Sequence, residues 1–65
     1  MVTIYWWGIE TEDSELCGEE FLTELENATS ADHIEYARKL FPGEELVCYG
    51  EVSEYEAEAM GIDTY

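Results

Sequence analysis

The chain almost lacks basic side chains. Arg38 and Lys39 are the only two in 65 residues, and they are neighbours in the sequence. A protein that binds the phosphate backbone of a nucleic acid, or a surface of anionic lipid, needs several cations spread over one face. The sequence therefore argues against direct binding to nucleic acid or to a membrane.

Long hydrophobic runs are absent as well. The apolar stretch at residues 1–8 is far shorter than the ~20 residues that cross a bilayer. It also carries none of the basic residues that begin a signal peptide. These two features predict a cytoplasmic protein.

Cysteine is scarce, and the positions of the cysteines suggest no metal site. Cys17 and Cys48 lie far apart in the sequence, without the short spacing of metal ligands. We expect two buried, reduced thiols, with a disulfide between them as the less supported alternative.

Residues suited to an active site are scarce too. His33 is the only histidine, and its position beside Asp32, just after the start of a helix, predicts a side chain that faces solvent or caps the helix. The acidic run at residues 10–15 fails the EF-hand pattern, because Glu15 stands where that loop needs glycine and Phe21 where it needs glutamate. We expect no enzyme activity, no metal and no cofactor.

Acidic side chains, in contrast, are abundant. The 17 Asp and Glu residues give a formal net charge of −15. A net charge of only ~2–8 keeps a small domain soluble, so about half of this charge destabilises the folded state by self-repulsion without a need for solubility. The excess indicates a function that requires the charge.

The apolar content predicts a folded domain rather than a disordered acidic chain. Hydrophobic residues make up 46% of the sequence, and they include 2 Trp, 5 Tyr and 2 Phe. Disordered acid-rich segments have few aromatic residues. A chain of this length can bury only ~60% of its unfolded surface, so we expect one domain over residues 1–65 with a thin margin of stability.

The pattern along the chain predicts a small α+β domain with the order β-α-α-β-α, in which helices pack on a small sheet. We expect strands at 2–8 and 46–52, a turn within 10–17, an amphipathic helix at 19–27, and a helix capped by Ser30 that ends at Pro42 and Gly43.

Signals near the C-terminus predict one more helix. Ser53 and Glu56 form a capping box that opens this helix, and Gly61 ends it after Met60. Residues 62–65 are expected to be extended or to form a short C-terminal strand.

Trp6 and Trp7 are consecutive in the first expected strand, so their side chains point to opposite faces of the sheet. Either helices or the C-terminal residues cover the second face, or one tryptophan is exposed beside the acidic surface as an anchor for a partner. The sequence leaves both arrangements open.

Charge is segregated along the chain, with −8 in residues 1–29, zero in 30–43 and −7 in 44–65. Acids at i,i+4 in a helix lie ~5–6 Å apart, and acids at i,i+2 in a strand lie ~6.7 Å apart. These spacings are of the order of those between neighbouring phosphates on a nucleic-acid strand. We predict that a basic partner binds the two acidic blocks, chiefly at Glu12, Asp13, Glu15, Glu19, Glu20, Glu24, Glu54 and Glu58.

In its small size, heavy negative charge, near absence of lysine, globular core and lack of a signal peptide, the chain resembles the acidic DNA-mimic inhibitors that phages and mobile elements use against host defence, including anti-CRISPR and anti-restriction proteins. The resemblance covers the whole chain as composition and charge layout, and no motif aligns. It implies an inhibitor in the cytoplasm of the host bacterial cell that occupies the basic DNA-binding cleft of a CRISPR effector or a restriction enzyme.

Two other functions stay open. The alternative to the DNA mimic is an acidic adaptor or antitoxin-like partner that neutralises one basic protein without imitating DNA. A salt-adapted domain, whose charge serves solvation, is less favoured because the acids are 14 Glu and only 3 Asp, and because the apolar content is undiminished.

Overall fold

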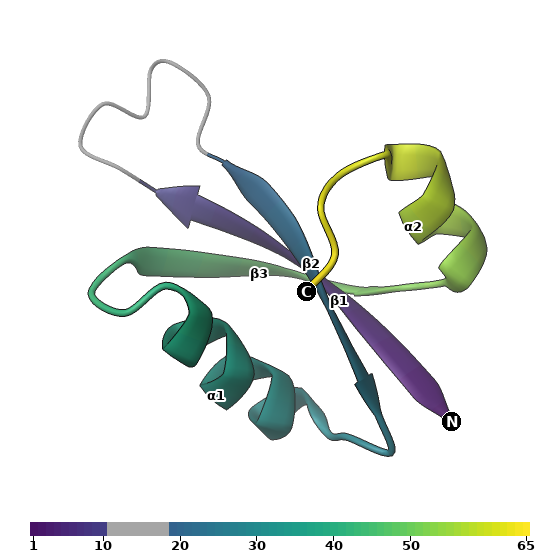
Figure 1. Cartoon of the computed structure of the whole chain (residues 1–65), viewed down its shortest axis with the longest axis horizontal. Helices are drawn as coiled ribbons and strands as arrows, with labels where there is room; N and C mark the ends of the chain where they lie inside the picture. The colour runs from purple at the N-terminus through teal and green to yellow at the C-terminus, as the bar shows by residue number, and fades with distance from the viewer. Residues whose placement is uncertain (11–18) are drawn as a thin grey trace.

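The computed structural model describes residues 1–10 and 19–65. Within these ranges a three-stranded sheet packs with two helices in an α+β arrangement (Figure 1). The turn expected within residues 10–17 falls mostly outside the described residues. The elements follow in the order β1 (Val2–Glu10), β2 (Glu20–Glu26), α1 (Ser30–Leu40), β3 (Glu45–Val52) and α2 (Glu54–Met60).

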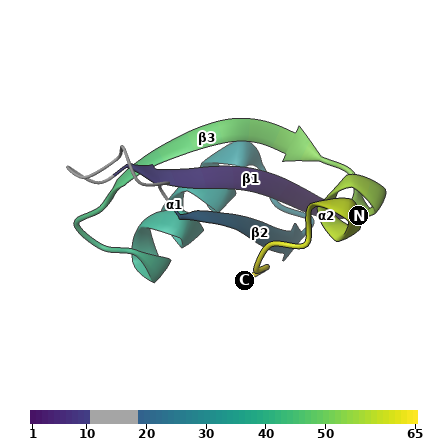
Figure 2. The same cartoon turned by 90° about the horizontal axis from the view of Figure 1, so that it is seen from above.

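Strand β1 is the centre of the sheet, whose strand order is β2-β1-β3. Both neighbours pair with β1 in the antiparallel direction, so β2 and β3 run parallel to each other. Helix α1 connects them and crosses β1 on the way. Figure 2 shows the three strands side by side with β1 in the middle.

The prediction of a helix at residues 19–27 is wrong, because Glu20–Glu26 forms strand β2. The order of elements is therefore β-β-α-β-α. Phe21 and Thr23 are buried on the face toward α1, and Leu22 is buried on the opposite face. A strand that is covered on both faces loses the alternation of apolar and polar residues, and its apolar spacing then imitates that of a helix.

The remaining elements match the expected ones closely. Helix α1 begins one residue earlier than expected, because its N-cap is Thr29 rather than Ser30. Thr29 and Asp32 form a capping box, in which the Thr29 backbone N–H donates to the Asp32 carboxylate at 2.8 Å. This hydrogen bond favours the charged form and lowers the pKa of Asp32.

Helix α2 has the predicted capping box of Ser53 and Glu56, and Gly61 ends it in the left-handed conformation with φ 64°. The residues after Gly61 are extended, as expected, and run beside β2. The Leu22 N–H donates to the Asp63 carbonyl at 2.8 Å, and the Tyr65 N–H donates to the Leu22 carbonyl at 2.8 Å. The C-terminus thus adds to the outer edge of β2 as a short parallel segment.

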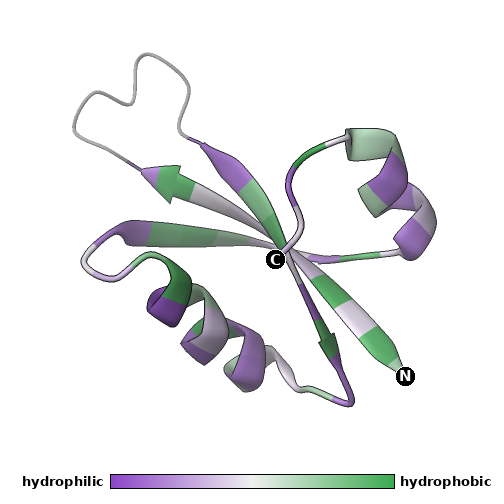
Figure 3. Ribbon diagram, in the orientation of Figure 1, coloured by the Kyte–Doolittle hydropathy of each residue, from purple (hydrophilic) through white to green (hydrophobic). Residues whose placement is uncertain are grey.

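The two helices lie on opposite sides of the sheet (Figure 1). The core between α1 and the sheet is built on Trp7, Ile9, Phe21 and Ala37. Hydrophobic positions recur along the strands, whereas the outward parts of both helices are largely hydrophilic (Figure 3). Neither helix of the described ranges is long and apolar enough to cross a membrane.

The two tryptophans occupy opposite faces, as predicted. Trp7 is only 3% exposed and belongs to the core under α1. Trp6 is half-buried on the other face, where it lines a shallow pocket with Ala59 and Met60 of α2. Its ring also packs against that of Tyr49, with centroids 4.5 Å apart. Helix α2 therefore covers part of the second face, and neither tryptophan is fully exposed.

Candidate acidic interaction surface

Every acidic side chain that the structure describes is exposed. These are 14 of the 17 in the sequence, since three of them lie in the segment that is not described. Those three, Glu12, Asp13 and Glu15, belong to the predicted binding residues and fall outside the described residues. The other five predicted residues, Glu19, Glu20, Glu24, Glu54 and Glu58, are all exposed.

The strand identity of β2 changes how its acids are arranged. Glu20 and Glu24 pair with Gly8 and Ile4 of β1 and share the sheet face opposite α1, together with Glu26. Two steps of about 6.7 Å separate Glu20 from Glu24, rather than the single turn expected of a helix. The acids form a row along the strand, in which Glu20 and Glu24 lie on either side of the buried Leu22.

Glu19 precedes this row and belongs to the end of the sheet. Its carbonyl accepts a hydrogen bond from the Ile9 N–H at 2.8 Å, which fixes its backbone beside β1. By the alternation of strand positions it lies on the α1 side, with Phe21. It therefore does not belong to the row of Glu20 and Glu24, although Glu19 and Glu20 line one pocket at this end of the sheet.

Glu54 and Glu58 lie four residues apart on α2, with a Cβ separation of ~5–6 Å. Because α2 packs over Trp6 and Val52, it stands on the same side of the sheet as the β2 row. The fold thus brings four predicted residues to one side of the molecule. With Glu26, which was not predicted, they form what we call the acidic face: Glu20, Glu24, Glu26, Glu54 and Glu58.

Both basic side chains lie away from the acidic face. Arg38 and Lys39 are in the last turn of α1, on the opposite side of the sheet. Asp32 and Glu35 of the same helix balance them in formal charge. The acidic face consequently has no basic side chain to neutralise it. The nearest cation is the N-terminal ammonium of Met1, which donates to Asn27 beside Glu26 at one end of the face.

A buried network of side-chain hydrogen bonds links the sheet to α1, and the sequence analysis did not predict it. His33 has an exposed fraction of 0%, so the prediction that it faces solvent or caps the helix is wrong. One ring nitrogen, Nδ1, lies 2.7 Å from the Thr23 hydroxyl, and the other, Nε2, lies 2.7 Å from the Thr3 hydroxyl. The Thr23 oxygen also accepts from the Trp7 indole N–H at 2.9 Å. The signal in the sequence was the four-residue spacing of positions 33 and 37, which places His33 on the same helix face as the buried Ala37.

Only one tautomer of His33 lets each of these groups pair. If Nε2 carries the proton, it donates to Thr3, whose hydroxyl donates on to the carbonyl of Leu25 or Ala28 at 3.4–3.5 Å. Nδ1 then accepts from Thr23. A second proton on the ring would leave the Thr23 hydroxyl without an acceptor for its own proton. Burial also lowers the pKa of His33, although the negative charges of Asp32 and Glu51 oppose this shift. The histidine is neutral and structural.

Cys48 is a free, exposed thiol on β3, so the expectation that it is buried is wrong. Its partner in the alternative disulfide, Cys17, lies outside the described residues. Among the residues that the structure describes, no group of three His, Cys, Asp or Glu side chains is arranged to hold a metal ion.

Comparison of the chain with protein-family models, with curated proteins and with solved structures found no match.

Proposed function

We propose that the protein is a nucleic-acid-mimic inhibitor, which occupies the basic DNA-binding cleft of a host defence nuclease complex and blocks the binding of target DNA. The complex is a CRISPR effector or a restriction enzyme in the cytoplasm of the host bacterial cell. The observation that carries the proposal is the acidic face, in which five exposed acids share one side of the sheet. Both basic side chains lie on the helix of the other side, where they are accompanied by further acids.

Charge density supports the proposal. The domain is 36 Å long in its longest direction. A DNA duplex carries one charge per ~1.7 Å of its axis, so a duplex of that length carries about 21 phosphate charges. The net charge of −15 is of the same order. A cleft that attracts the duplex would also attract this domain.

The acids are held on ordered elements, which favours their use as a binding surface. Strand β2 is paired on one edge with β1 and on the other with the C-terminal residues. Helix α2 begins with a complete capping box and ends at a left-handed glycine. Because the charges are positioned before binding, association does not have to order a flexible chain.

The proposal involves no catalytic step. The single histidine is buried and has a hydrogen-bond partner at each ring nitrogen, so it is not available as a general base for an external substrate. Inhibition would result from occupancy of the cleft alone, and electrostatic attraction would chiefly speed association.

The test compares charge reversals on the two sides of the sheet. One variant carries Glu20→Lys with Glu24→Lys, and another carries Glu54→Lys with Glu58→Lys. A control carries Ala31→Lys with Glu35→Lys at two exposed positions of α1, which changes the net charge by three instead of four. Each variant is checked for an unchanged fold by circular dichroism. We expect each acidic-face pair to weaken binding to the defence complex by more than about tenfold, and single Gln replacements to have little effect, because the surface is distributed.

The partner is first isolated from lysate of a defence-active bacterium and then titrated in the presence of labelled target DNA. Mutual exclusion of DNA and protein is the expected result. Simultaneous binding would favour the alternative, an acidic adaptor or antitoxin-like partner of a basic protein. Equal losses for the acidic-face and control pairs would show that net charge alone, and not this face, determines binding.

A further inference from the structure

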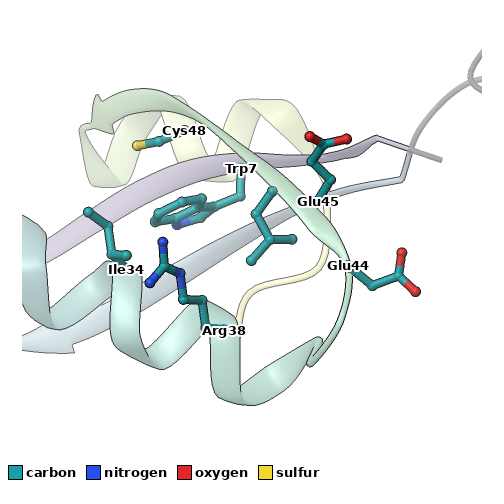
Figure 4. A pocket seen from close by; sticks show the side chains of 7 residues that line it. Trp7, Ile34, Arg38, Glu44, Glu45 and Cys48 are labelled. Atoms are coloured by element: carbon teal, nitrogen blue, oxygen red, sulfur yellow. The ribbon is translucent and has the colours of Figure 1, made fainter.

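A groove of about 400 Å³ lies between α1 and β3. Helix α1 packs mainly over β2 and leaves the β3 side of the sheet less covered. Trp7 forms the floor, Ile34 and Arg38 of α1 form one wall, and Leu46 and Cys48 of β3 form the other (Figure 4). Ile34 is 38% exposed, so this wall presents apolar surface to solvent.

The groove borders β3, which is an edge strand of the sheet. The hydrogen bonds of β1 show in which direction the backbone N–H and C=O groups of β3 point. The Ile9 N–H donates to the Glu19 carbonyl, and the Asn27 N–H donates to the Met1 carbonyl. Odd-numbered residues of β1 therefore direct their backbone groups toward β2, and even-numbered residues direct theirs toward β3.

The residues of β3 that face these even-numbered positions are Glu45, Val47, Gly50 and Val52. Between them, a bulge at Tyr49 shifts the register by one. The remaining residues turn their N–H and C=O groups away from the sheet. These outward residues are Leu46, Cys48 and Glu51.

The opposite edge of the sheet shows that a strand can be added in this way. By the same alternation, Leu22 and Glu24 of β2 direct their backbone groups outward, and both bond to the C-terminal residues. Among the described residues, β3 has no such neighbour. Its edge offers unpaired backbone groups of the kind that bind an extended segment.

Two features coincide at Leu46 and Cys48. Their backbone groups point outward, and their side chains line the groove on the α1 face, since they pair with Ile9 and Trp7. In a strand added to β3, side chains opposite Leu46 and Cys48 would project to that same face. They would enter the groove above Trp7, while alternate side chains would point to the other face.

Charge selects the occupant. Two acids, Glu44 and Glu45, line the groove, and Glu51 lies farther along the same edge. Arg38 is the only basic side chain that lines the groove, so acids outnumber bases there. With a net charge of −15, a second copy of this chain would be repelled, whereas a basic segment would be attracted. We propose that the β3 edge and the adjoining groove bind an extended basic segment of a partner protein, with apolar side chains at every second position inserted above Trp7. This proposal does not depend on mimicry of DNA.

The probes are two capped peptides of equal charge, Lys-Val-Lys-Leu-Lys-Val-Lys and Lys-Ser-Lys-Ser-Lys-Ser-Lys, titrated into the full chain at about 0.15 M salt to screen unspecific attraction. We expect the first peptide to bind at least about tenfold more tightly, because only its side chains gain burial in the groove. Amide hydrogen exchange measured by NMR should slow at Leu46, Cys48 and Glu51 and stay unchanged at Leu22.

A matched pair of variants tests the groove itself. Ile34→Ser removes an exposed apolar side chain from its wall and should weaken binding of the first peptide several-fold, about the loss expected for one apolar contact. Tyr55→Ser removes an 82% exposed side chain on α2, outside the groove, and should leave binding unchanged. Equal affinities for the two peptides, no binding of either, or no added protection on β3 in the unmodified protein would overturn the proposal.

Discussion

The indole N–H of Trp7 on β1 donates to the hydroxyl of Thr23 on β2 across 2.9 Å, in a part of the core closed to solvent. The same hydroxyl lies 2.7 Å from His33 of α1. One small polar side chain thus connects both strands and the helix. Because buried donors and acceptors without partners are costly, this connection makes the position sensitive to loss of the hydroxyl.

Thr23→Val should destabilise the domain by about 2–4 kcal/mol, because it leaves the Trp7 N–H and the Nδ1 atom of His33 without a partner while it keeps the shape of the side chain. Thr23→Ser, which retains the hydroxyl, should lose clearly less. Urea unfolding followed by tryptophan fluorescence measures both. A loss for Thr23→Ser as large as that for Thr23→Val would contradict the expectation, because it would show that the methyl group contributes as much as the hydrogen bonds.

Acidification should destabilise the domain through His33. Burial lowers the pKa of this side chain in the folded state, whereas the unfolded chain titrates near the ordinary value of about 6.5. Between these two values the unfolded state binds more protons. The contribution to stability is therefore complete above about pH 6.5 and is lost as the pH falls toward the folded pKa, with a slope of at most about 1.4 kcal/mol per pH unit.

Two measurements check this pH dependence. Urea unfolding between about pH 8 and 5 should show a steeper loss for the natural chain than for His33→Gln, while carboxylate titration affects both alike. NMR titration of the His33 ring in the natural chain should place its midpoint below about 6.5. A midpoint at or above that value would contradict the neutral, buried histidine.

Gly8→Ala should displace the ring of Tyr49. A Cβ atom at Gly8 would lie 2.5 Å from the Tyr49 hydroxyl oxygen and 2.8 Å from its Cε2. Tyr49 is 53% exposed, so its ring can rotate away toward solvent, and the loss of stability should stay below about 1.5 kcal/mol. The fluorescence of Trp6, which packs on this ring, should change. In a Tyr49→Ala background the same substitution at Gly8 should have no further effect on fluorescence.

Added salt should raise the melting temperature. Screening reduces the Debye length from ~30 Å at 0.01 M to ~8 Å at 0.15 M, which is shorter than the 15 Å thickness of the domain. Repulsion among the exposed acids, few of which have a cation nearby, then falls. Calorimetry over this range measures the effect. A flat or falling melting temperature would mean that self-repulsion is not a substantial part of the stability of this fold.

Local patterns were sufficient for several elements of the fold. The strands at residues 2–8 and 46–52, the helix opened by Ser53 and Glu56, and the stop at Gly61 all lie where expected. Turn and cap signals act within a few residues, so the sequence carries them directly. Strand β2 could not be recognised in this way, because burial of Leu22 on its second face depends on partners far along the chain.

For the candidate site, too, some features could be predicted from the sequence and others depended on packing. Exposure of Glu20, Glu24, Glu54 and Glu58 was expected from their charge alone. Their position on one side of the sheet was not, since it follows from β2 being a strand and from α2 packing over Trp6. His33 was misplaced because its hydrogen-bond donor, Thr23, and its acceptor, Thr3, are brought together only by pairing of β1 with β2.

By itself the sequence determined the net charge of −15, the confinement of both cations to residues 38 and 39, and enough apolar content for a core, because these are sums over residues that require no contacts. Only the tertiary structure decided which acids share a face, that the lone histidine is buried and neutral, and that β3 remains an edge beside a groove. Each of these depends on cross-strand register and helix packing, which join residues that are distant in the chain.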